Sequence, residues 1–216
     1  MKKITLFVLA LLVGMCVMTV PGYAQFTMKV GPLTGMNFNI HSGSDLKQTG
    51  TGVGFMIGGE ADMMFSSTVG ILTRLTLYDN KSGSYSESGT TQGYNYTADV
   101  SWSVAYFQIE PLFKFKIPHS GFYFVAGPSL GINVEGSQET TIKIEGYQDQ
   151  KNKGSIKDMQ ARFEIKAGAG YDFSISRGLE ISPELMFGYG LTKVVSDVSW
   201  RILSIQAAAS VKFSVL

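Results

Sequence analysis

Apolar and polar residues alternate one by one along most of this chain, and this period of two constrains its fold more than any other feature. The clearest stretch is 161–174, where Phe163 and Ile165 occupy one set of alternate positions and Arg162 and Glu164 the other. Successive side chains of a β-strand point to opposite faces of its sheet, so the alternation predicts strands with one apolar and one polar face. Beyond the N-terminal segment, no stretch shows the 3.6-residue period of an amphipathic helix.

Strands and connections follow one another in a regular order. Strands are expected at about 26–40, 53–63, 71–78, 107–116, 122–133, 161–174, 179–191 and 203–215. Short turns are expected at 66–68, 118–121 and 176–178, and long polar loops at 41–50, 79–97, 135–157 and 192–200. Short turns at one end and long loops at the other are the layout of an outer membrane β-barrel, and an even strand number places both termini at the short-turn end.

Alternation alone does not decide which face points inward, because a soluble barrel around an apolar ligand has the same pattern inverted. Three features favour a polar interior. The lumen of an eight-stranded barrel is narrow, and the polar face mixes glycines with long charged side chains whereas the apolar face is bulky. The later strands keep their pattern for about 12 residues, enough to cross a bilayer. Aromatic residues such as Phe115 and Tyr189 lie near strand ends, as at a membrane boundary.

We therefore expect an all-β, eight-stranded antiparallel up-and-down transmembrane β-barrel. Only 16% of the residues are charged, which suits a chain that faces lipid. The polar positions nevertheless carry both signs, and an unpaired charge in a dry lumen would be very costly. We predict a structural network of ion pairs that fills the lumen. Its expected members are Glu60, Asp62, Arg74, Glu110, Lys114, Lys116, Arg162, Glu164, Lys166, Asp172, Glu180, Glu184 and Lys212.

Three prolines fit this scheme poorly. Pro111, Pro128 and Pro183 fall inside expected strands, and a closed barrel has no edge strand to host them. All three belong to the outward face, and we expect β-bulges there. A break in the strands at these prolines would change the strand count.

The N-terminus has the pattern of a cleaved signal peptide. Lys2 and Lys3 precede an apolar run at 4–20, and Gly22 and Ala24 are suitably small for a cut before residue 25. A retained membrane anchor is the alternative, but the run is at the short end for a spanning helix. We expect two parts, a signal peptide at 1–24 and a barrel domain at 25–216. The single cysteine, Cys16, lies in the first part, so the barrel would contain no thiol.

Four sequence segments carry a family resemblance: Gly52–Glu60, Tyr106–Phe115, Phe122–Gly131 and Ala167–Asp172. With them the chain resembles the porin-like outer membrane β-barrel domain family common in Bacteroidota, related in architecture to the OmpX and OmpA barrels. The resemblance covers about 25–216. It implies a protein of the bacterial outer membrane, in contact with its lipid and inserted by the outer membrane assembly machinery. It implies little about activity, because most members have no assigned function.

A search for reaction chemistry assigns no catalytic, cofactor-binding or metal-binding residue. His41 is expected in the first long loop and His119 in a short turn, so the two histidines would lie at opposite ends of the barrel. The segment 41–45 holds a base, hydroxyls and a carboxylate, and we interpret it as a solvated polar loop. The net charge of +1 provides no basic face for nucleic acid.

The long loops are the more promising surface. Tyr85, Tyr94 and Tyr96 lie among small polar residues, a composition that suits adaptable binding of an extracellular partner. The alternating run 140–145 could extend a hairpin and offer a strand edge. The leading hypothesis is a non-enzymatic outer membrane barrel with a structural or surface-interaction role through its long loops. The alternatives are a small pore, a rim-located lipid-modifying enzyme, and a periplasmic soluble barrel that binds an apolar ligand.

Overall fold

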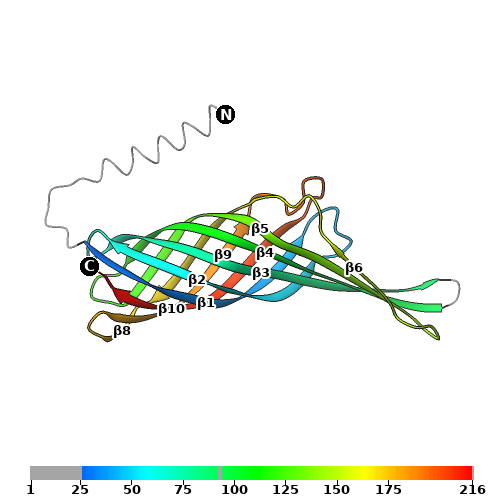
Figure 1. Cartoon of the computed structure of the whole chain (residues 1–216), viewed down its shortest axis with the longest axis horizontal. Coiled ribbons are helices and arrows are strands. Elements are labelled where there is room, and N and C mark those ends of the chain that lie inside the picture. Colours follow the sequence, from blue (N-terminus) through cyan, green and yellow to red (C-terminus); the bar gives the residue numbers. More distant parts are fainter. Residues whose placement is uncertain (1–25, 92–93, 216) are drawn as a thin grey trace, which may run out of the picture.

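The described part of the chain is one antiparallel sheet that closes on itself. The computed structural model describes residues 26–91 and 94–215, so the signal peptide expected at 1–24 lies outside the described residues. Figure 1 shows a barrel with a long extension at one end. Within the described part, no helix has both the length and the apolar character needed to cross a membrane.

Eight strands form the ring, as the alternation predicts. The strands are β1 (Thr27–Ser42), β2 (Gly50–Met64), β3 (Val69–Thr91), β4 (Tyr94–Lys116), β5 (Phe122–Ile144), β6 (Gln150–Ser155), β7 (Arg162–Tyr171), β8 (Phe173–Ser176), β9 (Leu179–Gly190) and β10 (Arg201–Ser214). β10 pairs with both β9 and β1 and so closes the barrel. β7 and β8 act as a single strand, because the register of β7 with β9 continues into β8 as far as Ser174. β6 pairs only with β5, outside the ring.

The short turns and the chain ends lie at the same end of the barrel. Lys29 near the start of β1 pairs with Ser214 at the end of β10. The tight turns 65–68, 117–121 and 177–178 close this end, while the longer connections lie at the other (Figure 1). This arrangement confirms the layout of an up-and-down barrel.

The prolines neither break the strands nor create bulges, so the bulges expected at them are wrong. Ile109 pairs with Leu130 and Phe113 with Ala126, and this constant register places Pro111 directly opposite Pro128. The ladder loses pairings there because proline has no N–H, but its register continues. In the same way, the register places Tyr171, the last residue of β7, opposite Pro183, and the ladder with β9 resumes at Phe173.

Two bulges lie at the end of the barrel that carries the long connections, and a further register shift, between Ser174 and Ser176 of β8, lies beside the short turn 177–178. β3 gains a residue between Thr76 and Asp79, and β5 gains one between Asn133 and Glu135. The two irregularities flank β4 on either side. A bulge bends a strand and increases its twist. The bulge of β5 lies just beyond Gly131, where β5 stops pairing with β7, whereas β3 continues to pair with β2 beyond its own bulge, as far as Ser84.

Much of the sequence expected as long loops continues as strand. The segments 79–97 and 135–157 largely extend β3, β4 and β5 and supply β6. Together, residues 84–91, 94–101, 137–144 and 150–155 form a four-stranded sheet, which we call the arm, that projects beyond the barrel (Figure 1). Its sequence is rich in Ser, Thr and Tyr. Thr and Tyr favour strands, but the apolar contrast that reveals the barrel strands is weak here.

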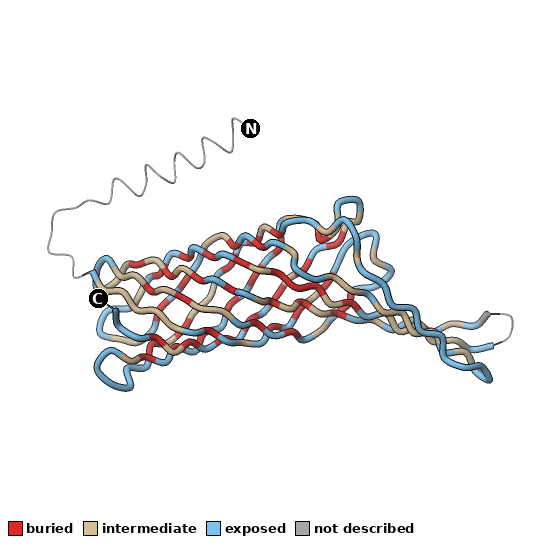
Figure 2. The backbone as a smooth tube through the Cα atoms, in the orientation of Figure 1, coloured by how far each residue is buried: buried red, intermediate tan, exposed pale blue. Residues whose placement is uncertain are grey.

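The polarity of the two faces reverses between barrel and arm. In the barrel, Leu130 and Ile132 point outward and are 59% and 64% exposed, while the inward residues are buried and mostly polar. A smaller set of inward residues is apolar, including Leu72, Leu112 and Met186. Figure 2 shows buried and more exposed residues alternating along the barrel strands. In the arm, the face that continues the lumen carries apolar residues such as Val100 and Ile142, and the opposite face carries residues such as Ser86. Lipid lies outside the barrel, so the reversal indicates where lipid gives way to water.

A pair of lysine substitutions on β5 tests this boundary. Leu130→Lys places a charge in the middle of the apolar band and should destabilise the barrel by about 2–4 kcal/mol. Ser137→Lys, on the outward face of the arm, should change stability by less than about 0.5 kcal/mol. Urea unfolding of the protein in phospholipid vesicles measures both. Equal losses for the two variants would contradict the proposed position of the boundary.

Candidate functional site

The inward-facing charges form ion pairs across the lumen. Of the residues expected in this network, all are buried except Lys116, which is half-buried at the short-turn end. Nearest that end, Asp172 accepts hydrogen bonds from Lys114 and Lys212 at 3.0 Å each, and from Lys116 at 3.1 Å. Asp62 binds the first two lysines from the other side, at 2.6 and 2.9 Å. Two carboxylates and three ammonium groups therefore form one cluster.

Arg74 is the centre of the next cluster of charged side chains along the barrel axis, and we call these successive clusters levels. Its guanidinium lies 3.0 Å from the carboxylate of Glu60, 2.7 Å from that of Glu184 and 3.6 Å from that of Glu110. These residues come from β3, β2, β9 and β4, so the cluster connects strands across the barrel. Arginine suits this position because its planar group offers five donors in fixed directions.

A third level lies towards the long connections. Lys166 donates to Glu110 at 2.7 Å and to Gln108 at 3.0 Å. Arg162 pairs with Glu164 and also donates to the carbonyl of Ile202. Hydrogen bonds and charge pairing together offset the desolvation of these groups.

Three members of this network were missed by sequence reasoning. Lys81 pairs with Asp79 at 2.9 Å, and both were assigned to a loop. Lys29 pairs with Glu180 at the short-turn end. Asp79 and Lys81 are two residues apart, as on one face of a strand, but the bulge between Thr76 and Asp79 shifts them by one residue from the inward positions Arg74 and Thr76. The alternation of the first part of β3 therefore does not predict their inward position.

The lumen is electrically neutral. Among the described residues, its side chains comprise eight carboxylates and eight cations. The carboxylates are Glu60, Asp62, Asp79, Glu110, Glu164, Asp172, Glu180 and Glu184, and the cations are Lys29, Arg74, Lys81, Lys114, Lys116, Arg162, Lys166 and Lys212. Equal numbers of opposite charges can compensate one another, and no single sign dominates the path along the axis.

A histidine held between two tryptophans lies above the charged levels. His41 is fully buried, and its Nδ1 accepts hydrogen bonds from the indole Nε1 of Trp102 at 2.8 Å and of Trp200 at 3.0 Å. Its Nε2 lies 3.0 Å from the carbonyl oxygen of Ser82. One tautomer, protonated at Nε2, satisfies all three contacts. We call this arrangement the cap, because it separates the charged lumen from the outer end.

The cap corrects the expected position of His41. The residue is the last inward position of β1, which runs to Ser42, and not part of a solvated loop. Asp45 lies in the following loop, where its carboxylate accepts a hydrogen bond from the backbone N–H of Ser199 at 2.6 Å. The base and the carboxylate of this segment are thus engaged separately. No group of metal-ligating side chains occurs within the described residues.

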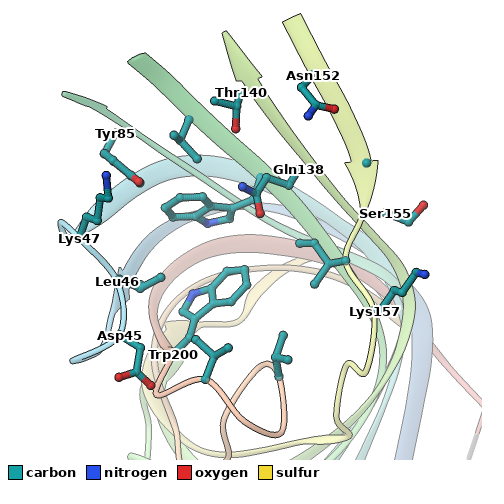
Figure 3. Close-up of a pocket in the computed structure, with 16 residues that line it drawn as sticks. Asp45, Leu46, Lys47, Tyr85, Gln138, Thr140, Asn152, Ser155, Lys157 and Trp200 are labelled. Atoms are coloured by element: carbon teal, nitrogen blue, oxygen red, sulfur yellow. The ribbon is translucent and has the colours of Figure 1, made fainter. Parts of the chain in front are cut away.

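A pocket of about 540 Å³ opens on the outer side of the cap. We call it the mouth pocket. Trp102 and Trp200 form its floor, Tyr85 and Leu46 contribute to its walls, and polar side chains of the arm lie around it (Figure 3). Gln138 is one of these side chains. The pocket therefore combines an apolar interior with a polar rim.

The three tyrosines expected in a loop lie on strands of the arm. Tyr85 packs beside Trp102 with ring centroids 5.7 Å apart. Tyr96 covers Gly89 so closely that a Cβ at residue 89 would lie 2.8 Å from its ring, which explains the glycine. Tyr94 packs edge-on against Tyr147, 5.6 Å away. All three occupy the face of the arm that continues the lumen.

The edge expected at 140–145 is not free at residues 140–142, which pair with both β4 and β6, whereas Lys143 and Ile144 pair with β4 alone. The opposite face of the arm is held by polar contacts. Asp99 accepts hydrogen bonds from Ser86 at 2.6 Å and from Lys143 at 2.9 Å. These two donors hold the pKa of the Asp99 carboxyl below its usual range, so the arm keeps this negative charge in neutral solution.

Comparisons with known proteins agree with the fold. The model of the family described as outer membrane protein beta-barrel domain matches residues 19–196. No curated protein matches the chain. Similar solved structures include Ail, the attachment invasion locus protein of Yersinia pestis, at 10% identity over 86% of this chain and 98% of that chain, with a TM-score of 0.41.

Two further solved structures show the same range of similarity. Neisserial surface protein A is 13% identical over 86% of this chain and 97% of that chain, with a TM-score of 0.42. The outer membrane protease OmpT from Escherichia coli is 9% identical over 91% of this chain and 99% of that chain, with a TM-score of 0.36. At such identities and scores the likeness carries no information about activity.

Removing the central cation of the lumen tests how far the barrel depends on its ion pairs. Arg74→Met leaves three buried carboxylates without their shared partner and should destabilise the barrel by about 3–5 kcal/mol. Arg201→Met, at an exposed position of β10, is the matched control and should have little effect. Urea unfolding in vesicles gives both values. Similar stability of the two variants would show that the network is dispensable.

Proposed function

We propose that this chain, which belongs to the outer membrane protein β-barrel domain family, is a non-enzymatic surface protein that binds an extracellular partner. The barrel lies in the lipid of the outer membrane. The binding surface would consist of the mouth pocket and the inner face of the arm, which is the face that continues the lumen. The observation that carries the proposal is the reversed polarity of the arm, since it leaves half-exposed apolar residues such as Tyr96 and Ile142 facing inward outside the membrane.

The lumen supports an anchoring role for the barrel in preference to a pore. Oppositely charged side chains meet across it at successive levels, and an eight-stranded barrel is just wide enough for side chains to fill. The cap of His41, Trp102 and Trp200 adds an apolar layer at the outer end. In this proposal the charges have a structural role, and solutes do not cross the barrel.

The arrangement at the rim supports binding in preference to catalysis. A general base needs a ring nitrogen that can reach a substrate, but both nitrogens of His41 are engaged in the buried cap. Asp45 is engaged by the backbone of Ser199. The arm, in contrast, offers tyrosine and aliphatic side chains beside amides and hydroxyls, a combination typical of adaptable binding surfaces.

The proposed function also requires that the chain is exported and inserted into the outer membrane. Export would use a signal peptide at 1–24, and the assembly machinery of the outer membrane would insert the barrel domain at 25–216. The Bacteroidota type of the family likewise stays a prediction.

Photo-crosslinking from the two faces of the arm tests the function in intact cells. A benzophenone amino acid at Tyr96 faces the proposed binding side, and the same group at the adjacent Thr97 faces away and is the matched control. Because benzophenone inserts into C–H bonds of proteins and glycans alike, we expect adducts of increased mass from position 96 and not from 97. Equal adducts from both positions, or none from either, would contradict a specific partner. Discrete conductance steps in a planar bilayer would favour a pore instead.

A further inference from the structure

We propose that the mouth pocket binds an uncharged saccharide. This inference rests on the proposed function and names the chemical class of the partner. A pyranose ring has an apolar C–H face and a rim of hydroxyl groups, so a matching site needs an apolar floor and a rim of neutral donors and acceptors. The described residues provide both parts, and they do so from separate elements of the fold.

The floor is apolar although it is made of two indoles. Trp102 and Trp200 are 5% and 6% exposed, and both direct their only hydrogen-bond donor away from the pocket, to Nδ1 of His41. The pocket is therefore lined by carbon atoms of the two indole rings. The ring of Tyr85 stands beside Trp102, tilted by 54°, and continues the aromatic surface up one wall.

On the side of the arm, the rim consists of uncharged polar side chains. Gln138 and Thr140 of β5 and Asn152 and Ser155 of β6 line the pocket on the side of the arm, with Trp200 deeper in it (Figure 3). Amides and hydroxyls both donate and accept hydrogen bonds, as the hydroxyl groups of a sugar do. Gln138 and Asn152 are exposed, so their amides are accessible to a ligand.

The charges at the pocket favour an uncharged ligand over an anion. Lys47 lies 3.4 Å from the carboxylate of Glu87, and the carboxylate of Asp45 is held by the backbone N–H of Ser199. Lys157 is the remaining ammonium group of the lining. An anion finds no cluster of cations here, in contrast to sites built for phosphate or sulfate, which group several basic donors.

The surroundings favour a compact sugar unit over a peptide or a lipid. The lining comes from the segments 45–47, 85–102, 138–157 and 195–200, which enclose the pocket on several sides, whereas an extended peptide needs a strand edge. The neighbouring free edge, β6, contains Lys151 and Lys153, residues that discourage strand addition. A purely apolar ligand would bury the polar rim without hydrogen bonds.

The chain contains its own reporter for this pocket. Its sequence has two tryptophans, Trp102 and Trp200, and both form the floor. Intrinsic tryptophan emission therefore reports on the mouth pocket alone. The experiment uses the protein in micelles of an amine-oxide detergent, because detergents with sugar headgroups would compete for the site.

The test combines a glycan array with titration of the glycans that bind. The array carries neutral α- and β-linked hexose and pentose oligosaccharides, sialylated and sulfated glycans, and neutral O-polysaccharide fragments of lipopolysaccharide. We expect binding of neutral glycans with a saturable change in tryptophan emission. Binding of the lipopolysaccharide fragments would place the source in the cell's own membrane, and binding of the other neutral glycans would place it outside the cell.

A matched pair of double variants locates the binding. Gln138→Ala with Asn152→Ala removes two amides of the rim and should weaken binding about tenfold or more. Glu139→Ala with Lys153→Ala changes a cross-strand pair on the opposite face of the same two strands and should leave affinity unchanged. Equal losses in both variants would overturn the assignment to the mouth pocket.

Failure of the saccharide proposal is distinguishable from failure of the proposed function. An array on which no neutral glycan binds, or on which only anionic glycans bind, would overturn the saccharide. If crosslinking at position 96 then still captures a protein partner, the surface-binding function stands and the partner is a peptide or protein. If neither experiment gives a specific product, both proposals are wrong.

Discussion

Backbone hydrogen bonding in lipid is the constraint on which the rest of this structure depends. A strand that crosses a bilayer must pair every N–H and C=O with a neighbouring strand, because lipid offers no partners, and only a closed ring achieves this for all strands at once. The pairing of β10 with β1 and β9 closes that ring. Pro111, Pro128 and Pro183 show how much the ring tolerates, since each removes a donor locally while the register continues on either side.

Closure of the ring determines which side chains must be apolar and which must be polar. Alternate residues face lipid and the remainder face a narrow lumen, so the same pleat requires apolar residues outside and mutually compensating groups inside. Eight carboxylates and eight cations meet this requirement among the described residues. Beyond Ser84 of β3 and the bulge of β5 the constraint no longer holds. There the strands have water on the outside, the polarity of the faces reverses, and β6 is left with a free edge. The apolar inner face of the arm and the cap below it then form a pocket, which a uniformly polar loop region would not provide.

The sequence predicts the barrel well because the contrast between apolar and charged residues is strongest where lipid and a buried lumen lie on opposite sides. Apart from the hairpin extension expected at 140–145, the arm was missed for the same reason, since Ser, Thr and Tyr alternate there with little contrast in polarity. Asp79 and Lys81 were for this reason predicted in a loop, although their side chains pair within the lumen. His41 lies just past the predicted end of its strand, and its burial depends on Trp102 and Trp200, which are distant in sequence. No local pattern could have brought these three together.

Cysteine labelling along one strand tests the central claim, that a closed barrel in lipid changes into an arm in water, which in β5 occurs at the bulge between Asn133 and Glu135. Single cysteines at the outward positions of β5 would be treated in intact cells with a membrane-impermeant maleimide. The unsubstituted chain is the control, since Cys16 is its only cysteine. The account predicts that cysteines replacing Phe124, Leu130 and Ile132 stay unlabelled and that those replacing Ser137 and Lys143 are labelled. Uniform labelling along the strand, or labelling only at residues 124–132, would contradict it.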